Sequence, residues 1–101
     1  MKIRYTPEAL IELDDVLAGI AEHSPQGAGR ISNRIEAVVK LLSEHPYSGQ
    51  PASSKPMRRI VASPYPYIIF YEPGDGEVVI IGIRHAARDP SSMPDTQTRL
   101  D

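Results

Sequence analysis

The first half of the chain changes from a short alternating pattern to a helical one. Lys2 to Tyr5 alternates polar and apolar residues, which predicts a strand. Thr6-Pro7 then supplies an N-cap residue and a proline at the first helical position. Apolar residues recur afterwards with helical spacing, at Leu10, Leu13, Leu17 and Ile20. This pattern predicts an amphipathic helix over residues 7–22.

A second helical stripe follows after a few residues. Ser24-Pro25 repeats the start signal, and apolar residues recur at Ile31, Ile35, Val38 and Leu42. His45-Pro46 ends this helix, because the residue before a proline is driven out of the helical region. The short connection predicts that the two helices form an antiparallel hairpin.

The second half of the chain has the composition of strands. Residues 47–56 contain Ser48-Gly49 and two prolines, which predicts an exposed loop. Residues 57–63, 66–72 and 77–84 predict three strands, the last two joined by a tight turn at 73–76. Residues 77–84 are apolar on both faces, so we expect this strand at the centre of the sheet and covered on both sides.

The order β-α-α-β-β-β predicts an α+β fold in which the helical hairpin packs on a mostly antiparallel sheet. We expect a single domain over residues 1–90. Residues 91–101 are polar and predict a loose tail that a partner could order.

Composition adds limits to this picture. The chain has 101 residues, no cysteine and 41% hydrophobic residues, which favours a cytoplasmic domain held together by packing alone. The longest apolar run, Val78 to Ile83, is far shorter than the ~20 residues of a membrane span. The N-terminal segment alternates and does not have the pattern of a signal peptide.

The net charge of −2 argues against a protein that grips bare nucleic acid unaided. The charge is uneven, however. Residues 1–46 carry five basic and seven acidic side chains, whereas residues 55–90 carry five basic and four acidic ones, three of them near the turn. We therefore expect an acidic helical layer and a basic patch on the sheet side, aimed at a protein partner.

Five side chains in the second half are the candidate site residues: Arg58, Arg59, Arg84, His85 and Arg88. One hypothesis is a ribonuclease site, with His85 as acid or base and the arginines holding a phosphate. The alternative is that His85 only satisfies a loop hydrogen bond, while the arginines contact a partner or stay solvated over packed stems. Whether Arg58 and Arg59 meet Arg84 and Arg88 depends on strand stagger and loop packing.

Other chemistry is less favoured. Tyr65, Tyr67 and Tyr71 could stack on bases, but we expect them to pack within the sheet. The three histidines lack metal-ligand spacing, and no phosphate-binding loop is present, so we predict neither a metal site nor a cofactor.

Over residues 1–90 the chain resembles the ParE/RelE superfamily of toxins from bacterial type II toxin–antitoxin systems. The resemblance is carried by Thr6-Pro-Glu-Ala-Leu10, Leu42-Ser-Glu-His-Pro46 with Gly49, Met57-Arg-Arg-Ile60, Pro66-Tyr-Ile-Ile-Phe-Tyr71 and Ile83-Arg-His-Ala-Ala-Arg-Asp89. It implies the β-α-α-β-β-β fold, growth inhibition by the free toxin, and a cognate antitoxin encoded beside it. It also implies a heterotetramer or larger complex that touches operator DNA only through the antitoxin.

The superfamily has two branches. RelE-like toxins, which cleave mRNA on the ribosome, commonly carry an arginine after the first tyrosine of the middle strand and a late tyrosine. Here Ile68 follows Tyr67, and no tyrosine follows Tyr71. The ending at 85–89 is similar to that of ParE-like toxins, which implies binding to DNA gyrase without catalysis.

Two alternatives remain open. The first is a RelE-type mRNA endonuclease that uses His85, Arg84 and Arg88, with Arg58 or Arg59. The second is a family member that binds its antitoxin and inhibits nothing. For the antitoxin we expect an apolar groove with basic flanks, at a sheet edge or on the exposed stripe of the helical hairpin.

Overall fold

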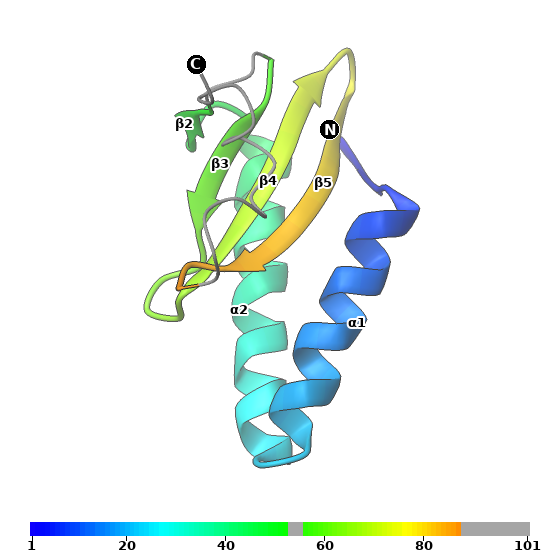
Figure 1. Ribbon diagram of the computed structural model, residues 1–101. Helices are drawn as coiled ribbons and strands as arrows, with labels where there is room; N and C mark the ends of the chain where they lie inside the picture. The colour runs from blue at the N-terminus through cyan, green and yellow to red at the C-terminus, as the bar shows by residue number, and fades with distance from the viewer. Residues whose placement is uncertain (53–55, 88–101) are drawn as a thin grey trace, which may run out of the picture.

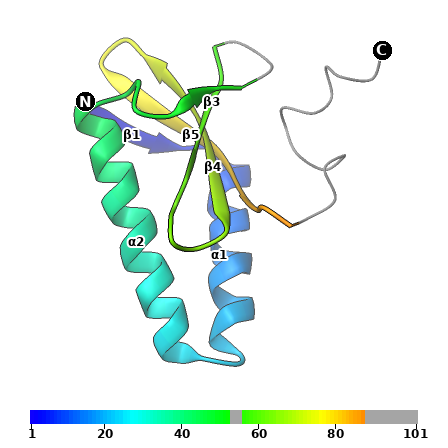
Figure 2. The same cartoon turned by 90° about the vertical axis from the view of Figure 1, so that its left-hand side faces the viewer.

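The computed structural model describes residues 1–52 and 56–87. Its elements are β1 (Lys2–Tyr5), α1 (Pro7–Ala21), α2 (Pro25–Glu44), β2 (Gln50–Pro51), β3 (Arg58–Val61), β4 (Tyr67–Gly74) and β5 (Glu77–His85). The two helices form an antiparallel hairpin that packs on one face of the sheet (Figure 1), and the tip of the hairpin projects beyond the sheet (Figure 2). The predicted α+β fold is confirmed.

The sheet has the strand order β1-β5-β4-β3-β2. The pairs β5/β4, β4/β3 and β3/β2 are antiparallel, and only β1/β5 is parallel. The sheet is therefore mostly antiparallel, as predicted. Strand β5 is paired along both edges, as predicted for a central strand, but the helices cover only one of its faces (Figure 1).

Both helices begin where their capping residues predicted. The Thr6 hydroxyl accepts the Ala9 N–H at 3.1 Å, and the Ser24 hydroxyl accepts the Gly27 N–H at 2.9 Å. Each cap satisfies one of the amide groups that a helix leaves without a partner in its first turn. The caps thus determine where the two helices start and how short their connection is.

The main core lies between the helices and the sheet. It includes Ile35 and Leu42 of α2 with Ile69 and Tyr71 of β4, all 1% exposed or less. Strand β5 contributes Val78, Ile80 and Ile83, a spacing that strict alternation does not allow. The reason is a β-bulge opposite Phe70 and Tyr71, which inserts one residue into β5 and shifts its inward positions.

The opposite face of β4 carries a second, smaller cluster. Ala52, Met57 and Phe70 are buried there, and Ile68 and Ile81 pack against them. The second cluster therefore gives Ile68, Phe70 and Ile81 apolar contacts on the face of the sheet opposite the main core.

Two details of the sequence prediction are wrong. The segment 47–56 was predicted as a loop, but it contains β2, because Gln50 and Pro51 pair with the outer edge of β3. An edge position tolerates proline, which has no N–H to donate. Leu10 was predicted in the core stripe of α1, but it is 49% exposed, and Ala9, completely buried, faces the core instead.

Candidate functional site

The predicted site residues lie at two separate places along β4. Arg58 pairs in register with Tyr71, whereas His85 pairs with Tyr67. Four residues of strand separate these two levels, which is roughly 13 Å at about 3.3 Å per residue. The stagger that the sequence left open thus keeps Arg58 and His85 apart.

Arg58 holds the loop between α2 and β2, residues 45–49. Its Nη2 donates to the carbonyl oxygens of Gly49 at 2.7 Å and Tyr47 at 3.2 Å, and its Cζ lies 5.1 Å from the centre of the Tyr47 ring. The buried hydroxyl of Tyr71 joins this arrangement by donating to the Pro46 carbonyl at 2.9 Å. Arg58 therefore stabilises the conformation of this loop through its hydrogen bonds, in addition to carrying a positive charge.

Arg59 has a different environment because neighbouring residues of a strand point to opposite faces. It is exposed and borders a hollow at the outer edge of β3. The hollow is lined by Ser48, Gly49, Gln50, Arg59, Ile60, Val61 and Ile68. Strand β2 pairs only with Arg58 and Arg59, so it does not extend over Ile60 and Val61. Val61 is 47% exposed.

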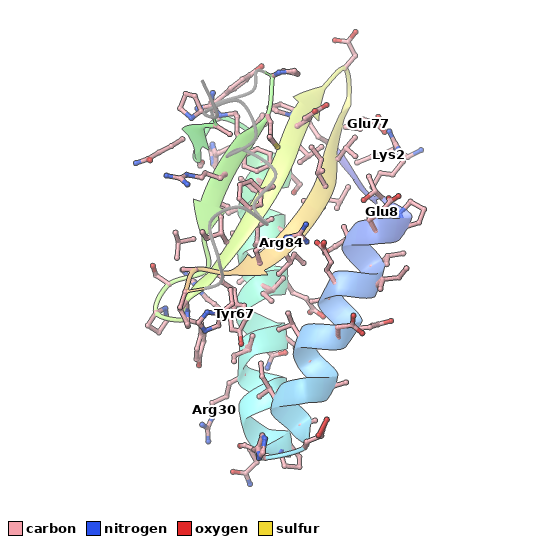
Figure 3. All side chains as sticks on the ribbon, viewed as in Figure 1. Lys2, Glu8, Arg30, Tyr67, Glu77 and Arg84 are labelled. Carbon is pink, nitrogen blue, oxygen red and sulfur yellow. The ribbon has the colours of Figure 1, made fainter. Side chains whose placement is uncertain are left out.

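Arg84 forms an ion pair with Glu12 of α1. Figure 3 shows Arg84 on the side of β5 that faces α1. The other oxygen of the same carboxylate accepts the main-chain N–H of Ile83 at 2.9 Å. One glutamate thus binds both a backbone amide of β5 and the neighbouring guanidinium.

This contact closes an edge of the sheet. Strand β1 pairs with β5 only as far as Ile80. Beyond that point the Thr6 hydroxyl donates to the Ile81 carbonyl at 3.3 Å, and Glu12 accepts from Ile83. Side chains at the start of α1 therefore replace a neighbouring strand, which leaves this edge less open to an added strand.

His85 lies at the end of β5 and makes local contacts. Its Nδ1 accepts the main-chain N–H of Ala87 at 3.0 Å, and its ring meets the Tyr67 ring edge to face, with centres 5.2 Å apart. When Nδ1 accepts, the neutral imidazole carries its proton on Nε2. The loop hydrogen bond considered from the sequence is present. Arg88 lies outside the described residues.

The structural roles of three residues in this region were not predicted from the sequence. Glu12 lies off the apolar stripe of α1, and helical periodicity does not distinguish a solvated carboxylate from one at a sheet edge. Tyr47 and Gly49 were assigned to a loop. An aromatic residue between Pro46 and a glycine is the signal that could have indicated a loop with a defined conformation. Tyr71 is completely buried, and Tyr65 and Tyr67 pack against the core, as expected.

No metal centre emerges from residues 1–52 and 56–87, which bring together no group of three His, Asp or Glu side chains able to hold an ion. Neither α1 nor α2 is long and apolar enough to cross a membrane.

The chain matches known proteins over most of its length. Residues 3–90 match the family model of the ParE toxin of the type II toxin–antitoxin system parDE. Toxin Y4kP of Sinorhizobium fredii is 39% identical over 84% of this chain and 88% of its own length. Toxin RelE2 of Caulobacter vibrioides is 37% identical over 86% of this chain and 97% of its own length.

A solved structure supports the fold independently. A chain of the chromosomal ParDE system from P. aeruginosa superposes with a TM-score of 0.72, covering 84% of this chain and 95% of the other, at 20% sequence identity. The match over residues 3–90, together with this similarity of fold, confirms the resemblance to the superfamily. The chain belongs to the ParE toxin family of type II toxin–antitoxin systems.

Proposed function

We propose that this chain, as the toxin of a type II toxin–antitoxin pair, inhibits growth in the cytoplasm by binding DNA gyrase, and that a cognate antitoxin neutralises it. The toxin assignment follows from family membership. The gyrase target is the part that we propose. It is based on the similarity between residues 85–89 and the ending of ParE-like toxins.

The observation that supports a binding mechanism is the separation of the candidate catalytic groups. Cleavage of a phosphodiester needs a proton carrier and concentrated positive charge around one phosphate. Here Arg58 lies about 13 Å along the sheet from the level of His85. Arg84 is paired with Glu12, and the Nδ1 of His85 is occupied by Ala87. This arrangement favours a protein that binds its target over a nuclease.

Induced expression in cells tests the target. A gyrase poison should cause DNA breaks, an SOS response and filamentation before translation falls. Rapid arrest of translation, with cuts inside codons of ribosome-bound mRNA, would overturn the gyrase proposal and support the RelE-type alternative. Normal growth at a high level of folded toxin would overturn both and indicate a toxin that only binds its antitoxin.

A substitution at His85 tests the mechanism separately. In His85→Asn the amide oxygen can still accept the Ala87 N–H, but an amide cannot take up and release a proton as an imidazole does. We expect this variant to inhibit growth as strongly as the wild type at the same protein level. The matched control is Tyr67→Phe, which keeps the ring that contacts His85. Loss of toxicity in His85→Asn alone would favour catalysis.

A further inference from the structure

A shallow pocket beside the start of β3 is lined by five apolar residues and one arginine. It is lined by Tyr47, Pro51, Pro56, Met57, Arg58 and Pro73, and we call it the Tyr47 cradle. Its walls come from the α2–β2 loop, β2, the approach to β3 and the end of β4. Three of the six residues are prolines, whose backbone angle φ is fixed by the ring.

Tyr47 is an exposed aromatic residue that contacts Arg58 through both its ring and its carbonyl. It is 70% exposed, more than any other large apolar side chain in the described ranges. Its ring lies against the Arg58 guanidinium, and its carbonyl accepts from the same group. A tyrosine ring has few rotatable bonds and already has one face against a guanidinium here, so it can cover a large area on a partner at a low cost in conformational entropy. Tyr47 therefore has the properties of an anchor residue at a protein interface.

Arg58 brings a positive charge into this pocket. Within the described residues its hydrogen bonds go only to the main-chain carbonyls of Tyr47 and Gly49, and its Nε is buried without an acceptor. Arg84, which is also half-buried, has the carboxylate of Glu12 as a partner. Because a half-buried charge without a counter-charge is costly, the cradle is electrostatically complementary to an acidic group.

We propose that the Tyr47 cradle is a docking site for the antitoxin, which places an apolar side chain and an adjacent carboxylate there. The apolar side chain packs against Tyr47 and the proline walls, and the carboxylate pairs with Arg58. This inference rests on the proposed function in one respect, namely that a cognate antitoxin binds this chain. It adds the place of binding and the chemistry of the bound segment.

Binding of the purified antitoxin to the full chain, measured by calorimetry, tests the anchor. Tyr47→Ala should weaken binding at least tenfold, since loss of an interface anchor commonly has at least this effect. Tyr47→Phe should bind like the wild type, because it keeps the ring over Arg58. The matched control is Leu10→Ala, which removes an exposed apolar side chain from α1. Equal affinities of Tyr47→Ala and wild type would overturn the docking site, as would a loss confined to Leu10→Ala.

A double-mutant cycle tests the charge. Each acidic residue of the antitoxin is neutralised by Asp→Asn or Glu→Gln and measured against the wild-type chain and Arg58→Lys, a cation without the planar fork. One neutralisation should weaken binding to the wild type severalfold and have a clearly smaller effect on Arg58→Lys. The control is Arg30→Lys on α2, whose side chain points to solvent (Figure 3). Equal effects in both backgrounds for every acidic residue would overturn the charge pairing.

Two readouts separate failure of the site from other failures. Thermal unfolding of each variant detects a damaged fold. If Tyr47→Ala unfolds, Tyr47→Phe still tests the anchor, because weaker antitoxin binding by Tyr47→Phe would also contradict the proposal. If the wild-type chain itself does not bind the antitoxin, the proposed function and the docking site both fall. If the wild type binds and Tyr47→Ala binds equally well, the docking site alone is wrong.

Discussion

The Tyr71 hydroxyl accepts the main-chain N–H of Gly49 at 3.0 Å, and no larger residue fits at position 49. Tyr71 is completely buried in β4, so packing holds its hydroxyl in place. A Cβ on Gly49 would lie 2.5 Å from the Arg59 carbonyl oxygen and 2.6 Å from the Tyr71 hydroxyl. This close approach ties the α2–β2 loop, and with it Tyr47, to the sheet.

Gly49→Ala should therefore destabilise the protein by about 2–4 kcal/mol, because neither the β3 backbone nor the buried Tyr71 can move aside easily. Urea unfolding measures the change. The matched control is Gly19→Ala on α1, where an added Cβ meets nothing within 4 Å. There we expect a gain of roughly 0.4–1 kcal/mol from the lower entropy of the unfolded chain. Similar effects at both positions would contradict the close contact at Gly49.

Tyr71→Phe should cost about 1–3 kcal/mol of unfolding free energy. The substitution leaves the Gly49 N–H and the Pro46 carbonyl without their partner. A buried polar group without a hydrogen bond destabilises the folded state by its full desolvation penalty. Hydrogen exchange of the Gly49 amide should accelerate at the same time. Tyr67→Phe, in a strand position on the same β4, serves as the control. An unchanged Gly49 exchange rate in Tyr71→Phe would show that the hydroxyl does not hold the loop.

Glu12→Ala should destabilise the chain by about 1–3 kcal/mol, because Ile83 loses its acceptor and Arg84 its ion-pair partner. Glu12→Gln should cost less, since its amide oxygen can still accept from Ile83. Chemical denaturation of both variants, with the exposed Asp15→Asn on the same helix as control, measures the difference. Equal costs for Ala and Gln would mean that the ion pair, and not the edge hydrogen bond, provides the stabilisation.

The Arg4–Glu77 pair across β1 and β5 should make stability depend on pH. Hydrogen bonding from Arg4, with the positive charges of Arg4 and Lys2, lowers the pKa of Glu77 below its ordinary value. A carboxylate with a lowered pKa in the folded state stabilises that state above its unfolded pKa, and the contribution disappears as the pH falls through the folded pKa.

We therefore expect the wild type to be slightly more stable than Glu77→Gln at pH 7, with the difference shrinking below about pH 4.3, the ordinary pKa of Glu. Urea unfolding at a series of pH values measures it, and added salt should reduce it because the pair is exposed. Asp75→Asn in the adjacent turn is the control. A difference that grows on acidification would contradict the sign of this linkage.

Local patterns in the sequence were sufficient for the elements and their order. The Thr6 and Ser24 caps, the helical spacing of α2 and the turn at 73–76 each depend on residues a few positions apart, so the chain states them directly. The α+β fold followed from these elements, and the family resemblance rested on the sequence motifs themselves. Leu10 and the two-residue strand β2 were missed, because helix rotation and edge pairing depend on distant contacts.

Only the tertiary structure decided what the charged residues do. Arg58, Arg84 and His85 were predicted as site residues from their positions in the sequence. Their partners lie on other elements or depend on the exact path of the chain: the carbonyls of the α2–β2 loop for Arg58, Glu12 on α1 for Arg84, and the Ala87 amide for His85. These contacts follow from strand register, the β5 bulge and the placement of α1, which the packing of the whole chain determines.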